Sequence, residues 1–204
     1  MSQDRRGGPR RGQQGRTRSG ARGQGGPRRG YSASRPSERS RRTTSSREVA
    51  LEGLRLVREE DAYANLVLPR LLRTHRLSGR DAAFTTELFY GTLRAQGRLD
   101  AVLAACVDRP LDEVDPALLD VLRLGAHQLL DMSVAPHAAT SETVALARSR
   151  VGAGAASFAN AVLRRVGEQD LDSWLARVAP DRGTDPSGHL AVVHSHPRWV
   201  VRAL

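Results

Sequence analysis

Few side chains in this sequence could perform covalent chemistry. Cys106 is the only cysteine, so the chain cannot form an internal disulfide or a zinc site rich in thiolates. Cys106 lies in an apolar stripe with Val102 and Leu103. This pattern predicts a small buried side chain rather than a nucleophile.

The histidines offer a second kind of chemistry, metal binding. His194 and His196 could hold a metal ion, but two ligands without a third make a weak site. They stand before Pro197, which suits the first turn of a helix, and we interpret them as hinge residues. His127 and His137 lie beside core positions and are interpreted as hydrogen-bonded structural groups. No Ser/His/Asp set follows from spacing, and we predict no catalytic, cofactor-binding or metal-binding residue in this chain.

The basic residues point to phosphate binding, and all 32 of them are arginine. The formal net charge is +10, but it is unevenly distributed. Residues 1–46 contain 13 arginines against Asp4 and Glu38, whereas residues 47–204 contain 19 arginines and 20 acidic residues. The excess positive charge therefore belongs to the first segment, and the rest of the chain is close to neutral.

Three arginine groups in or next to the predicted helices are candidates for an RNA-binding face. One leads into the first predicted helix, one is an i, i+4 pair, and one projects from the last core helix. If they converge, they form a phosphate-binding surface. The alternative is that they pair with nearby acids, as charges on helices usually do. The candidates are Arg41, Arg42, Arg47, Arg94, Arg98, Arg164 and Arg165.

Residues 1–44 are rich in Arg, Gly, Gln, Ser and Pro and have almost nothing apolar to bury. Such a segment cannot offset the entropy of ordering, so we predict a disordered tail. Arginines dispersed on a flexible chain suit loose, salt-sensitive RNA contact. A solubilising extension is the alternative.

Apolar residues recur at helical spacing from residue 47 to residue 168, and no segment alternates with period two for long. The pattern predicts an all-α bundle of about seven helices, with a domain over residues 45–168 and a helical linker over residues 169–204. Ser45 and Glu48 fit a capping box at the start of the first helix. Asp115-Pro116 is an N-cap followed by an N1 proline, and Gly97 is expected to interrupt a helix.

Two glycines, Gly91 and Gly125, lie on apolar faces inside predicted helices. A glycine there costs about 1 kcal/mol relative to alanine, so we expect each to mark a close approach of two helices. No stretch approaches the roughly 18 consecutive apolar residues of a membrane span. The N-terminus has no apolar segment of a secretory signal. We expect a cytoplasmic, reducing setting without membrane contact.

Three stretches carry a resemblance to a known family. They are "LSGRDAAFTTELFYGTLRAQGRLD" (77–100), "LRLGAHQLLDMSVAPHAATSETVALAR" (122–148) and "FANAVLRRV" (158–166). In this order and spacing they resemble the NusB-like domain, a helical RNA-binding fold. It occurs alone and also fused to rRNA cytosine-C5 methyltransferases of the RsmB (Sun/Fmu) type. "REVALEGL" (47–54) also resembles the start of NusB, whose arginine-rich N-terminus contacts RNA, which supports Arg41, Arg42 and Arg47 as candidates.

The wording of "YGTLR", "RLGAHQLL" and "NAVLRRV" is more similar to the methyltransferase branch, and so is the His-Pro-x-Trp phrase at His196–Trp199. The resemblance implies a parent enzyme that transfers a methyl group from S-adenosylmethionine to C5 of a cytosine in small-subunit rRNA. None of the cofactor or cysteine motifs of that reaction stands in this chain, and Cys106 matches no catalytic position. We therefore expect a fragment that docks on rRNA and that ends at Leu204, within a helix that has only just begun.

Two other roles remain open. A stand-alone transcription antitermination factor of the NusB type is one, although residues 169–204 count against it. The other is a protein-interaction module that binds a ribosomal protein or associates with itself, and the near-neutral composition of residues 47–204 keeps this role open.

Overall fold

Every regular element in the part of the chain that the structure describes is a helix. The computed structural model describes residues 36–204, with side chains from Ser46 onward. The described elements are α1 (Pro36–Glu60), α2 (Ala64–Thr74), α3 (Gly79–Cys106), the 3₁₀ helix η1 (Leu111–Glu113), α4 (Pro116–Leu130), α5 (Pro136–Arg150), α6 (Ala153–Val166), α7 (Leu171–Val178), α8 (Pro186–Val193) and α9 (Arg198–Ala203). The all-α prediction is confirmed. The predictions for residues 1–35 lie outside the described part of the chain.

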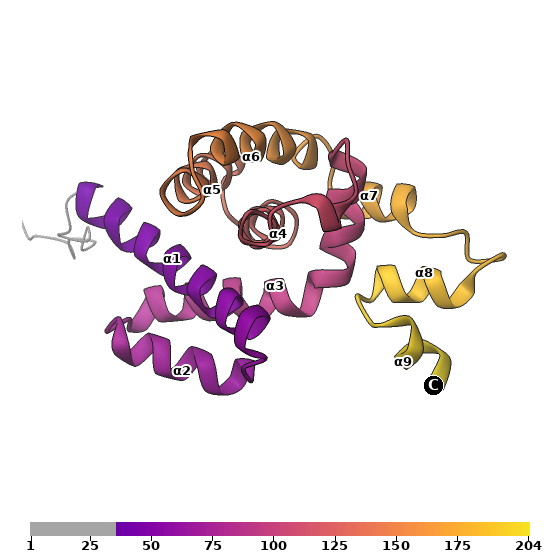
Figure 1. The fold of residues 1–204 in the computed structure, drawn as a ribbon, viewed down its shortest axis with the longest axis horizontal. Helices are drawn as coiled ribbons and strands as arrows, with labels where there is room; N and C mark the ends of the chain where they lie inside the picture. The colour runs from indigo at the N-terminus through magenta and orange to yellow at the C-terminus, as the bar shows by residue number, and fades with distance from the viewer. Residues whose placement is uncertain (1–35) are drawn as a thin grey trace, which may run out of the picture. The chain divides into compact units, whose positions relative to one another are not determined.

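Helix α4 is the centre of the core. It contacts α1, α3, α5 and α6, and Figure 1 shows it nearly end-on between them. Its apolar side chains are buried, as the stripe in the sequence predicts. They include Leu118, Val121, Leu122, Leu124 and Ala126.

The start of α4 follows the predicted capping. The Asp115 side chain accepts a hydrogen bond from the Leu118 N–H at 2.9 Å, and Pro116 occupies the first helical position. The carboxylate satisfies one of the N–H groups that have no partner inside the helix, and the proline has no N–H to satisfy. The boundary of this central helix is therefore encoded locally.

The two helical glycines mark close approaches, as expected. A Cβ atom on Gly91 of α3 would lie 2.1 Å from His127 Nε2 of α4, and one on Gly125 of α4 would lie 2.6 Å from Leu163 Cδ2 of α6. Both distances are far below a van der Waals contact, so only glycine lets these helices approach so closely.

Two predicted boundaries are wrong. Gly97 does not interrupt a helix, because α3 is continuous from Gly79 to Cys106, and so six α-helices and η1 lie before residue 168. The chain at Ser195 packs closely against Gly97. The first helix begins at Pro36 and not at Ser45. Proline suits a first turn, and no further proline or glycine occurs before Gly53.

The last three helices are attached to the bundle by specific contacts. Trp174 of α7 is 2 % exposed and donates its indole N–H to the carbonyl oxygen of Val166 at 2.9 Å. Hydrogen bonds from Ser173 lower the pKa of the Asp170 carboxyl, which caps α7. Asp185 caps α8 in the same way, and α8 packs on α3. No helix among residues 36–204 has the length and apolar character needed to span a membrane.

Candidate nucleic-acid interface

Arg47, one of the candidate RNA-binding residues, lies in the core. It is 3 % exposed, and its Nε donates a hydrogen bond to Gln128 Oε1 at 2.7 Å. Its guanidinium carbon lies 5.1 Å from the centre of the Phe84 ring, and burial lowers its pKa. Arg47 therefore links α1 to α3 and α4. Arg41 and Arg42 also belong to α1, but their side chains lie outside the described part.

The two arginines at the end of α6 have different surroundings. Arg165 Nη1 donates to the Cys106 carbonyl at 2.9 Å and to Asp108 Oδ1 at 3.1 Å, so it holds the C-terminal end of α3. Arg164 is exposed and lines a groove of about 480 Å³ between α5 and α6, together with polar residues that include His137 and Asn160. His137 is exposed, unlike the structural group that we expected.

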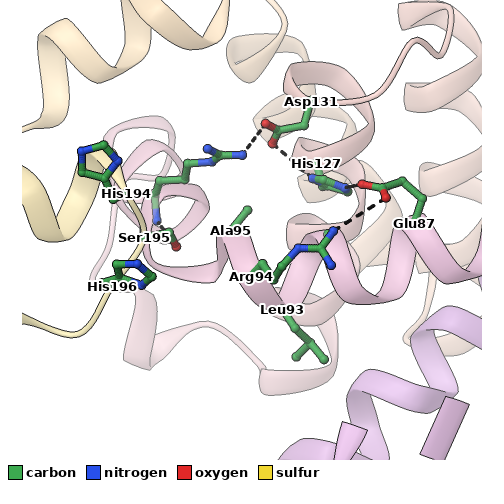
Figure 2. A pocket seen from close by; sticks show the side chains of 11 residues that line it. Glu87, Leu93, Arg94, Ala95, His127, Asp131, His194, Ser195 and His196 are labelled. Carbon is green, nitrogen blue, oxygen red and sulfur yellow. Dashed lines mark hydrogen bonds and ion pairs between the residues drawn. The ribbon is translucent and has the colours of Figure 1, made fainter. Parts of the chain in front are cut away.

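Arg94 and Arg98 meet in a larger cleft. It has a volume of about 600 Å³ and lies between α3, α4 and the turn that joins α8 to α9. We call it the turn cleft, and its polar lining residues are Glu87, Arg94, Arg98, His127, Asp131, His194, Ser195 and His196. Figure 2 shows the two histidines of the turn on one side and Glu87, His127 and Asp131 on the other. Arg94 and Arg98, four residues apart on α3, thus line the same cleft.

The carboxylates of the turn cleft hold its arginines with unequal strength. Arg98 donates through Nη2 to Asp131 Oδ1, and both side chains are largely buried. Arg94 Nη2 lies 3.7 Å from Glu87 Oε2, and these side chains are 68 % and 56 % exposed. Because an exposed pair at this separation contributes little, Arg94 is easily diverted to another anion.

His127 forms the inner wall of the turn cleft. Its side chain is 3 % exposed, and its Nδ1 pairs with Asp131 Oδ2 at 3.1 Å. Its Nε2 lies 3.6 Å from Glu87 Oε1, which is beyond hydrogen-bond distance. Among the buried side-chain nitrogen and oxygen atoms of the described residues, His127 Nε2 and Arg98 Nε are the two without a hydrogen-bond partner. Both belong to residues that line this cleft.

The turn at residues 194–197 is seated against α3. Ser195 has a positive φ of 55°, and its Oγ accepts a hydrogen bond from the backbone N–H of Arg98 at 3.3 Å. A Cβ on Gly97 would lie 3.3 Å from the same oxygen. The hinge interpretation of His194 and His196 placed them correctly between two helices. It missed their position at a cleft, because no local signal indicates which part of the bundle a linker will touch.

A second arginine network has a structural role. Arg58 Nε of α1 donates to Asp120 Oδ2 at 2.8 Å, and Arg123 donates to Asp120 Oδ1 at 3.3 Å. Arg123 also reaches both oxygens of Asp100 on α3. The Asp120 side chain is 4 % exposed. This network joins α1, α3 and α4, and it shows why arginine content alone overestimates the cationic surface.

Cys106 is 1 % exposed, as expected for a small apolar side chain, and burial raises the pKa of its thiol to about 11. Since only the thiolate is alkylated, we expect iodoacetamide at pH 8 to react at least about a hundredfold more slowly with the folded protein than with the denatured protein. Intact-mass spectrometry over time measures both rates. Equal rates would contradict the buried, protonated thiol.

Comparison of the sequence with known proteins identifies a matching family. The model of the NusB family matches residues 44–168. A Mycobacterium tuberculosis protein named "Putative methyltransferase Rv1407" is 51 % identical over 165 residues, which are 81 % of this chain and 36 % of the relative. A Bacillus subtilis protein named "Probable ribosomal RNA small subunit methyltransferase B" is 36 % identical over 160 residues, which are 78 % of this chain and 34 % of the relative. The chain thus spans about a third of the length of these relatives.

A solved structure described as "Crystal Structure of a Plectonemic RNA Supercoil" contains a chain with a similar fold. The TM-score is 0.57 at 18 % identity, and the match covers 63 % of this chain and 94 % of that chain. At this identity the likeness supports the fold alone.

Proposed function

The chain belongs to the NusB family, and on this basis we propose that it is the rRNA-docking domain of an S-adenosylmethionine-dependent methyltransferase that acts on C5 of a cytosine in small-subunit rRNA. The observation that carries the proposal is the extent of the match to relatives with methyltransferase names. It covers 165 residues, and is therefore longer than the family domain at residues 44–168.

In this proposal the domain supplies binding rather than chemistry. Arginines of the domain contact RNA phosphates, and a tethered active site then meets its target base at a high effective concentration. The candidates are Arg94, Arg98 and Arg164, together with Arg41, Arg42 and the arginines that precede them. Arg47 and Arg165 support the bundle through Gln128 and the end of α3.

We assign no residue of this chain to the S-adenosylmethionine that the parent enzyme would use. A Rossmann-type site requires a glycine-rich turn between a strand and a helix, and residues 36–204 contain no strand. The described residues therefore do not fit that cofactor, and we derive no step through it. Methyl transfer remains a proposal about the parent protein.

A protein-interaction role is the second candidate. Tyr63 and Leu66, at the start of α2, are 75 % and 67 % exposed. Tyr63 immediately precedes α2 and Leu66 lies in its first turn, so both offer apolar surface near the same helix end to a ribosomal protein or a second copy.

A salt titration tests the docking role. The full chain and a variant that starts at Pro36 are titrated with small-subunit rRNA. We expect both to bind, and we expect the shorter chain to show a slope of log K against log salt between about −2 and −4, which corresponds to three to five phosphate contacts. No binding by either chain, together with retention of a protein partner, would contradict RNA docking in favour of the second candidate.

A further inference from the structure

The turn cleft combines features that a surface ion-pair cluster does not have. It is concave, and two different parts of the chain line it, since α3 and α4 form one side and the turn at residues 194–196 forms the other. Arg98 Nε and His127 Nε2, the two buried side-chain polar atoms without partners among the described residues, belong to residues that line it. Buried donors and acceptors are normally satisfied, so two unsatisfied atoms beneath one cleft mark its wall as incompletely hydrogen-bonded.

The donors of the cleft suit an anion. Arg98 uses Nη2 for Asp131, which leaves its Nε–H without an acceptor. Arg94 has only a long contact to an exposed carboxylate, so its guanidinium is available for a bidentate contact to phosphate. His194 and His196 are exposed at the rim, on the side away from Glu87 and Asp131. Their ring nitrogens can donate to phosphate oxygens without competing for the same carboxylates.

We propose that the turn cleft binds a phosphate group of an RNA backbone, with Arg94 and Arg98 of α3 and His194 and His196 of the turn as its donors. This inference rests on the proposed docking function and specifies where one RNA contact is made. It also gives the linker a role in binding, because half of the donors come from residues beyond the family domain at residues 44–168.

The openness of the cleft favours a polymer over a small phosphate compound. Arg94 is 68 % exposed, and both histidines lie at the rim. A site with donors at its mouth contacts a backbone that passes across it, whereas enzymes that capture small ligands bury most of the ligand surface. The histidine and arginine planes can also stack on bases next to the bound phosphate.

The test compares charge-matched variants of the full chain. Single-stranded RNA from the small-subunit rRNA is titrated by fluorescence anisotropy at several salt concentrations with the wild type, with Arg94→Gln and with the double variant His194→Gln/His196→Gln. Arg182→Gln is the control, since Arg182 is exposed in the loop between α7 and α8 and loses the same charge outside the cleft. All four positions are exposed, and thermal unfolding confirms that the variants fold.

We expect Arg94→Gln to reduce the magnitude of the salt slope by about 0.7 to 0.9, as the loss of one phosphate contact does, and to weaken binding about three- to tenfold. The double histidine variant should weaken binding, whereas Arg182→Gln should match the wild type. If the wild type binds steeply but the cleft variants behave like Arg182→Gln, the cleft assignment is overturned and the docking function stands. If the wild type binds no RNA, both fail. Inorganic phosphate that stabilises the wild type but not Arg94→Gln, without any change in RNA binding, would overturn the RNA assignment in favour of a small anion.

Discussion

Replacing Trp174 by alanine is expected to lower the free energy of unfolding by about 3 to 5 kcal/mol, the range for removing a large buried aromatic side chain. Trp174 is 2 % exposed, and its indole N–H satisfies the Val166 carbonyl, one of the carbonyl groups at the end of α6 that have no partner inside the helix. The variant thus loses apolar packing and a hydrogen bond at once. Guanidinium unfolding followed by circular dichroism measures the change.

Trp174→Phe separates the two contributions. It keeps an aromatic ring in the site but leaves the Val166 carbonyl without its donor, and should cost about 1 to 2 kcal/mol. An alanine variant that unfolds at the same denaturant concentration as the wild type would show that α7 is not held by this side chain.

Gly91→Ala is expected to destabilise the protein by about 2 kcal/mol or more, although alanine is the better helix former by about 1 kcal/mol. The new methyl group would lie 2.1 Å from Nε2 and 2.6 Å from Cε1 of His127, which is itself buried. To accommodate it, α3 must separate from α4, or the imidazole must leave its contact with Asp131. Thermal and denaturant unfolding quantify the loss.

Gly154→Ala is the matched control for this prediction. Gly154 lies in α6, and a Cβ atom there would meet nothing within 4 Å. Alanine should be neutral or stabilising by up to about 1 kcal/mol. If both variants are equally stable, the close approach of α3 and α4 at Gly91 does not constrain the fold.

The sequence predicts features that depend on neighbouring positions in the chain. The stripes of α4, its Asp115-Pro116 start and the close approaches at Gly91 and Gly125 are confirmed, since periodicity and capping express them locally. The prediction for Gly97, by contrast, is wrong. Its partner is Ser195, nearly a hundred residues further along the chain, so from the sequence alone it reads as a break in a helix.

The same distinction applies to the candidate site. Arg94 and Arg98 line one cleft because one helix carries both, whereas their role in RNA binding stays a prediction. The hydrogen-bond partners of Arg47 and Arg165 are Gln128 and the end of α3, which are far away in the sequence. No pattern around these arginines distinguishes a buried guanidinium from an exposed one. His127 was recognised as structural, but its partnership with Asp131 at i, i+4 was the local signal that we missed.

Arg98 belongs to two assemblies at once. Its backbone N–H holds Ser195 of the turn, and its side chain holds Asp131, which also pairs with His127 next to Gly91. A displacement of the turn would therefore be transmitted through one residue to the central helix. Such coupling is reciprocal. A molecule that binds the turn in its position against α3 gains affinity when the α3–α4 contact is stable, and its binding in turn stabilises that contact.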